Sequence, residues 1–134
     1  MLLVPINIVG VLLATIVSML IGIAWFSPFG FGPLWIRLSG VKMDQGKSPS
    51  LAMLVAVLCN FATACIVAEV LAWTHADTAR MAMLATFWLW LGFIAAVKLM
   101  HFMFDGRSLK LWLFYAVYDL VNVLLMAIVL VLWR

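Results

Sequence analysis

Four long apolar stretches, separated by short polar segments, constrain this chain more than any other feature. Each is about 20 residues long, which is the length that an α-helix needs to cross the hydrocarbon core of a bilayer. The stretches predict membrane-spanning helices at about 3–26, 51–73, 80–103 and 109–133. Of the 134 residues 69% are hydrophobic and 10% are charged, too few polar residues to cover a water-soluble domain. We therefore predict a single-domain, all-α integral membrane protein, a four-helix bundle whose partner is the lipid bilayer.

The segment after the first apolar stretch reads WFSPFGFGP and continues as LWIRLSG. Pro28 and Pro33, together with the neighbouring glycines, interrupt a continuous helix. Pro33 suits the first turn of a new helix. Trp35 and Ile36 beside Arg37 suit a segment that lies in the headgroup region. We expect a short interfacial helix here.

Lysine and arginine residues gather in the first and third loops. These residues are Arg37, Lys42, Lys47, Arg107 and Lys110. The opposite side has Arg80 and the terminal Arg134. Cytoplasmic loops of membrane proteins carry an excess of such residues, so we expect the first and third loops in the cytoplasm and both termini outside. The basic residues are too scattered to indicate a nucleic-acid site.

Several short motifs resemble those of one family. WFSP at residues 25–28, followed by FG and Trp35, is similar to the pattern W-[YF]-S-P…FG…W. LGF at residues 91–93 and FDGRSLKLW at residues 104–112 are similar too. The chain thus resembles bacterial small membrane proteins of the domain-of-unknown-function family numbered 1761. The resemblance implies a four-helix protein of the bacterial inner membrane, and it supplies no activity or catalytic residues.

An aspartate, Asp119, lies in the middle of the last apolar stretch. It is about 15 Å along the helix from Leu109, near the midplane of a hydrocarbon core about 30 Å thick. A carboxylate that faces lipid there is unfavourable by about 2.5–3.5 kcal/mol on insertion scales. We therefore expect Asp119 to face protein, water or a partner subunit, or to be protonated.

Tyr115, Tyr118, Asp119 and Asn122 follow one another at the spacing i, i+3, i+4, i+7, which predicts one polar helix face. Such a face is either a binding or ion-coordinating surface, or a set of hydrogen bonds that hold the bundle together. Asn60, near the middle of the second stretch, is a candidate neighbour of this face.

Lys98, in the third stretch, is a candidate counter-ion for Asp119. Pairing would let both groups stay ionised, because each charge offsets the desolvation of the other. The alternative is that Lys98 extends to lipid phosphates. His101 and Asp105, on the same predicted face, could share a proton or a metal ion. Two candidate ligands are a weak metal signal, however, so we assign neither a metal site nor a cofactor.

Two further features have structural and functional interpretations. Glu69, near the outer end of the second stretch, is expected to pair with His75 or Arg80 in a structural role. Small residues recur at every fourth position of the first stretch, which lets helix backbones approach closely. These residues are Gly10, Ala14, Ser18 and Gly22. This ribbon could form a homo-oligomer or could pack within the chain.

The chain has none of the common motifs for nucleotide binding, serine hydrolysis or zinc proteolysis. We do not expect an enzyme, although an intramembrane enzyme that acts on a lipid is a third, less favoured alternative. Our leading hypothesis is a transporter or channel-like protein with a polar intramembrane site around Asp119. The second is a non-catalytic subunit or assembly partner of a larger membrane complex.

Overall fold

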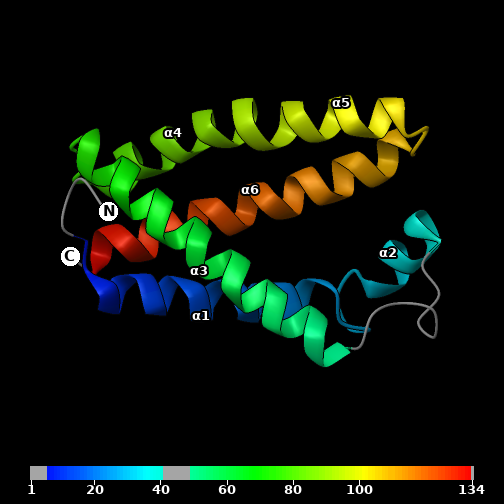
Figure 1. Cartoon of the computed structure of the whole chain (residues 1–134), viewed down its shortest axis with the longest axis horizontal. Coiled ribbons are helices and arrows are strands. Elements are labelled where there is room, and N and C mark those ends of the chain that lie inside the picture. Colours follow the sequence, from blue (N-terminus) through cyan, green and yellow to red (C-terminus); the bar gives the residue numbers. More distant parts are fainter. Residues whose placement is uncertain (1–5, 41–48, 134) are drawn as a thin grey trace.

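The computed structural model describes residues 6–40 and 49–133, which form a bundle of helices (Figure 1). In chain order the elements are α1 (Ile8–Trp25), α2 (Gly32–Ser39), α3 (Pro49–Trp73), α4 (Ala79–Trp90), the π-helical turn η1 (Leu91–Ala95), α5 (Ala96–Phe104) and α6 (Leu109–Leu132). Four helical segments are long and apolar enough to cross a membrane: Ile8–Trp25, Ser50–Trp73, Ala79–Phe104 and Leu109–Leu132. The predicted all-α fold with four spans is confirmed. Residues 3–5 of the first predicted span, Lys42, Lys47 and Arg134 lie outside the described residues.

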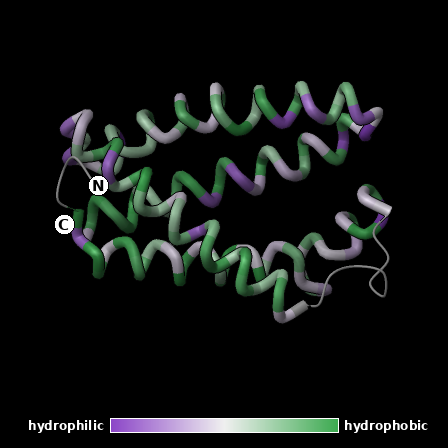
Figure 2. The backbone as a smooth tube through the Cα atoms, in the orientation of Figure 1, coloured by the Kyte–Doolittle hydropathy of each residue, from purple (hydrophilic) through white to green (hydrophobic). Residues whose placement is uncertain are grey.

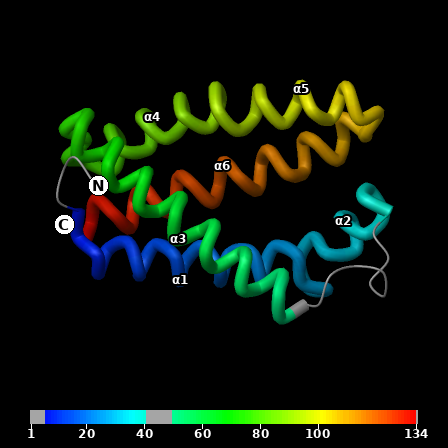
Figure 3. The backbone as a smooth tube through the Cα atoms, in the orientation of Figure 1, coloured from blue at the N-terminus to red at the C-terminus, as the bar shows by residue number. Residues whose placement is uncertain are grey.

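Helix α6 is at the centre of the bundle and contacts all the other helices. It runs between α1 and the long rod formed by α4, η1 and α5, while α3 crosses over α1 (Figures 1 and 3). The side chain of Asn7 donates a hydrogen bond to the carbonyl of Trp133, so the beginning of α1 lies beside the end of α6. Because α6 is surrounded, its polar residues contact protein on several sides.

Most of the helical surface is apolar, as a bilayer requires. Figure 2 shows hydrophobic residues along most of each helix and hydrophilic positions within the middle of α6. The tightly packed core lies toward the end of the bundle that contains the start of α1. Its fully buried members include Val11, Leu71 and Met126, one from each of α1, α3 and α6. The polar centre of α6 therefore lies beside this apolar core.

The break after α1 is a compact turn organised by Ser27. The Ser27 hydroxyl donates to the carbonyl of Ala24 at 2.8 Å and accepts from the amide of Gly30 at 3.1 Å. The Ser27 carbonyl accepts from the amides of Gly30 and Gly32, both at 3.0 Å. A Cβ at Gly30 would lie 2.3 Å from the carbonyl oxygen of Ala24, and one at Gly32 would lie 2.6 Å from that of Phe26. The closeness of these backbone oxygens explains why both positions are glycine.

We expect Gly30→Ala to destabilise the protein by about 1–3 kcal/mol, because the added methyl group meets backbone atoms that can move only if the turn opens. Thermal unfolding of the purified protein in mild detergent measures the loss. Gly92→Ala is the matched control, since a Cβ there meets nothing within 4 Å. Equal shifts in the two variants would show that the close approach at Gly30 does not determine stability.

The third span contains a π-helical turn, η1, that the sequence pattern did not predict. The amide of Ala96 donates to the carbonyl of Leu91, five residues earlier. Turns of this kind insert one residue into an α-helix and often lie at functional sites. Here the turn rotates α5 relative to α4 and precedes Lys98 by one short helical stretch. It therefore helps to set the direction in which Lys98 points.

Candidate functional site

An ion pair within the membrane-spanning region joins α5 to α6. The ammonium group of Lys98 contacts the carboxylate of Asp119, and the two side chains are 38% and 19% exposed, respectively. Lys98 also lies over the ring of Tyr115, with its nitrogen 5.6 Å from the centroid. At 1.5 Å per residue, Asp119 is about 15 Å from Leu109, the first residue of α6. Of the two alternatives for Lys98, the structure shows the pair with Asp119.

Two tryptophans fasten α6 to the rod that carries Lys98. The indole N–H of Trp90 donates to the carbonyl of Ala116 at 2.9 Å, and that of Trp112 donates to the carbonyl of Ala95 at 3.0 Å. The Trp90 bond has its donor on the rod, and the Trp112 bond has its donor on α6. The acceptor of the second bond, Ala95, is the last residue of η1. An indole N–H in a membrane must find an acceptor, so these bonds fix the spacing of the two helices around the ion pair.

A second polar cluster joins three helices on another side of α6. The Ser18 hydroxyl, from α1, contacts the side-chain amides of Asn122 on α6 and Asn60 on α3, the latter at 3.2 Å. The two amides are 3.4 Å apart. Ser18 is 0% and Asn122 7% exposed. The three side chains form a compact polar network, of which Asn60 is the partly exposed member.

The tyrosines of α6 contact different neighbours. Tyr118 packs against Phe26, with ring centroids 5.1 Å apart, and its hydroxyl lies beside Gly22. The hydroxyl of Tyr115 accepts a hydrogen bond from the indole of Trp35, on α2, at 2.8 Å. Tyr115 and the ion pair are thus on the side of α2 and α5, whereas Tyr118 and Asn122 are on the side of α1 and α3. The residues predicted to share one polar face are divided between two sites.

A cleft of about 360 Å³ borders the three-helix cluster. Its lining includes Ser18, Gly22, Asn60 and Tyr118, with apolar side chains from α1 and α3 around them. This volume is in the range of small-molecule sites, and a few polar groups in an apolar wall are typical of them. The cleft is therefore a second place, besides the ion pair, where a small solute could contact polar groups at membrane depth.

Comparison with known proteins gives one match, to a family model described as "Protein of unknown function (DUF1761)" over residues 9–131. The chain belongs to this family. The match includes nearly all of the four spans, so the resemblance inferred from the short motifs is confirmed. No curated protein and no solved structure matches the chain. Membership in DUF1761 assigns no activity, and the membrane character of the chain rests on its four long apolar helices.

The secondary candidates of this DUF1761 protein lie apart from the ion pair. His101 and Asp105 are exposed at the end of α5, and no group of three His, Cys, Asp or Glu residues able to hold a metal ion occurs in residues 6–40 and 49–133. Glu69 is 3% exposed on α3. Its expected pairing with His75 or Arg80 in a structural role stays a prediction.

The small-residue ribbon of α1 packs within the DUF1761 chain. Ala14 and Ser18 are 0% exposed. A Cβ at Gly10 would lie 3.3 Å from the carbonyl oxygen of Trp133, and one at Gly22 would lie 2.9 Å from the hydroxyl of Tyr118. Both neighbours belong to the region of α6, so the ribbon brings α1 and α6 together. Association between copies of the chain stays a prediction.

Sequence reasoning missed the donors and acceptors that hold these sites together. Trp35, Trp90 and Trp112 each donate a hydrogen bond to a neighbouring helix, a role that the sequence pattern did not predict. Ser18 was noted for its small size, and its hydroxyl proved to contact both asparagines. The available signal was the requirement that every N–H and O–H within a membrane find an acceptor.

Proposed function

We propose that this protein is a small transporter or channel-like protein of the bacterial inner membrane, with Lys98 and Asp119 as its ion or solute site. Both termini lie on the periplasmic side, as the distribution of lysine and arginine predicts. The observation that carries the proposal is a partly exposed ion pair within the membrane-spanning region. Polar and charged groups at such depth are rare and often mark the path of an ion or proton.

The incomplete coverage of Lys98 supports a path for water beside the pair. An ammonium group has three N–H donors. Among the residues that the structure describes, its hydrogen-bond acceptor is Asp119. The Lys98 side chain is 38% exposed. If hydrocarbon surrounded it, its remaining N–H donors would have no acceptor, at a large free-energy cost. Water in a path along α5 supplies the missing acceptors, and a second copy of the chain would complete the wall of that path.

The ion pair can bind cargo in two ways, and in both Lys98 and Asp119 first move apart. When Asp119 leaves Lys98, its carboxylate accepts a proton or coordinates a cation. When Lys98 is released, its ammonium binds an anionic solute. In each case the cargo neutralises one partner of the pair, and the released partner keeps an unpaired charge that the water path solvates. The η1 turn before Lys98 is where α5 can shift relative to α6.

Flux through reconstituted vesicles tests the proposal. We expect wild type to carry a proton, alkali cation or small anion current, and Asp119→Asn to lower it more than tenfold while the protein still assembles. Asp105→Asn is the matched control, because it removes the same charge from an exposed residue at the end of α5, outside the span. Absence of flux from wild type with any of these ions, or equal flux in the two variants, would refute the proposal.

A non-transporting subunit of a larger membrane complex is the second candidate. The network of Ser18, Asn60 and Asn122 favours it, because those polar groups bond to one another and stabilise the bundle. This candidate predicts a stoichiometric partner that co-purifies in mild detergent. It also predicts that the purified chain alone conducts no ion.

A further inference from the structure

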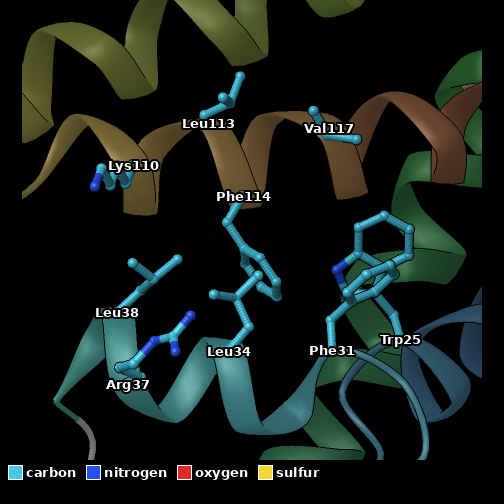
Figure 4. Close-up of a pocket in the computed structure, with 9 residues that line it drawn as sticks. All are labelled: Trp25, Phe31, Leu34, Arg37, Leu38, Lys110, Leu113, Phe114 and Val117. Carbon is cyan, nitrogen blue, oxygen red and sulfur yellow. The ribbon is translucent and has the colours of Figure 1, made fainter.

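A separate hollow lies between α2 and α6, away from the ion pair. It is an open groove of about 560 Å³ (Figure 4). Most of its wall is apolar and comes from Phe31 and Leu34 on one side and Leu113, Phe114 and Val117 on the other. This volume is sufficient for part of a lipid molecule. A groove that begins at a membrane interface and continues among apolar side chains is open to the surrounding bilayer.

Two cationic side chains stand at one end of this groove. Arg37 comes from α2 and Lys110 from the first turn of α6, and both are exposed. Figure 4 shows them at the same end, on opposite walls. Among the described residues that line the groove, Arg37 and Lys110 are the charged ones and none is Asp or Glu. Basic pockets between helices on the cytoplasmic side of a membrane protein bind anionic lipid headgroups.

The inner part of the groove has an unused hydrogen-bond donor. The Trp25 indole nitrogen is buried and has no acceptor among the residues that the structure describes. In Figure 4 this nitrogen is on the side of the ring that faces Phe114. The Trp25 ring is held in place by Phe31, with centroids 4.6 Å apart. Buried donors in proteins are nearly always satisfied, so an acceptor from a bound molecule is expected here.

The order of these groups along α6 matches the order of chemical groups in a phospholipid. Phe114, which contacts Trp25, lies about 6 Å deeper than Lys110, and Val117 lies about 10 Å deeper. From the mouth inward, the groove therefore presents positive charge, then an N–H donor, then apolar surface. A phospholipid presents a phosphate, then ester carbonyls, then acyl chains.

We propose that the groove binds one anionic phospholipid from the bilayer. Its phosphate and anionic headgroup contact Arg37 and Lys110, and one glycerol ester carbonyl accepts a hydrogen bond from the Trp25 indole. An acyl chain runs along Phe114 and Val117. The bound lipid joins α2 to α6 and is a site distinct from the Lys98–Asp119 pair.

Native mass spectrometry of the delipidated full-length protein, titrated with phosphatidylglycerol or phosphatidylcholine, tests the proposal. Wild type is expected to bind one phosphatidylglycerol at least tenfold more tightly than phosphatidylcholine. The double variant Arg37→Gln/Lys110→Gln should lose this preference. Arg107→Gln should keep it, because Arg107 lies at the same end of the bundle but stacks on Phe102, outside the groove. Equal binding of the two lipids by wild type, or an equal effect of Arg107→Gln, would overturn the proposal.

The role of the indole has its own readout, because both lipids carry ester carbonyls. Trp25→Phe should weaken the binding of both lipids by a similar factor and leave the preference for phosphatidylglycerol intact. An ether-linked phosphatidylglycerol, which lacks these carbonyls, should bind wild type and Trp25→Phe equally. If Trp25→Phe weakens the binding of the ester-linked and ether-linked lipids to the same extent, the assigned hydrogen bond is wrong.

Discussion

Replacing both members of the ion pair with apolar residues, in Lys98→Met/Asp119→Leu, should leave the protein folded and abolish its flux. Apolar residues of similar volume often replace a buried ion pair at no cost, or stabilise the protein by about 1–4 kcal/mol. A transport site, in contrast, needs the charges themselves. Thermal unfolding in detergent and flux in vesicles are measured on the same preparation.

The single variant Lys98→Met provides the comparison. It leaves the Asp119 carboxylate without its partner, a change that costs about 3–5 kcal/mol where both charges are fully buried. With Lys98 38% exposed, we expect the lower part of that range. The single variant should therefore be less stable than the double variant. A double variant that keeps wild-type flux would show that the pair only holds the helices together.

Asn122→Leu should destabilise the protein more than most other substitutions outside the ion pair. The Ser18 hydroxyl and the Asn60 amide both contact Asn122, so the buried Ser18 and the partly buried Asn60 would each lose a partner. A buried polar group left unsatisfied costs about 1–3 kcal/mol. Polar contacts between membrane helices are weaker on average, because the unfolded chain in a membrane also finds partners. We expect a total loss of about 2–4 kcal/mol.

Reversible unfolding of Asn122→Leu in mixed micelles, compared with Thr63→Ala, measures this loss. Thr63 is the control because its hydroxyl donates to the carbonyl of Cys59, in its own helix, at 2.9 Å. Its removal should change the free energy of unfolding by less than about 1 kcal/mol. Similar losses in the two variants would mean that the three-helix network does not hold the bundle together.

The four spans and the proximity of Lys98 to Asp119 could be predicted from the sequence. Both follow from one strong physical preference, the exclusion of charge from hydrocarbon, which acts regardless of the detailed packing. The prediction of a single polar face on α6 rested on helical spacing alone. Neighbouring residues on a helix point about 100° apart, so Tyr118 and Asp119 can contact different helices. Spacing does not reveal that α6 has neighbours on nearly every side.

Other features depend on three-dimensional contacts that have no pattern along the chain. The glycines after α1 were expected to break a helix, but the approach of Gly30 to the carbonyl of Ala24 required coordinates. The η1 turn inserts one residue within an otherwise uniform apolar run. The groove beside Trp25 exists because α2 lies beside the first turns of α6, a placement that neither helix indicates by itself.

The most direct test of the water path beside the ion pair is the reactivity of a cysteine at its edge. In a Cys59→Ala/Cys65→Ala background, Lys98→Cys and Val97→Cys are treated with a charged, membrane-impermeant thiol reagent in vesicles. Val97 is exposed and is the neighbour of Lys98 on α5. We predict rapid labelling at position 98 and little at position 97, because water reaches only the first. No labelling at 98, or equal labelling at both positions, would contradict the account.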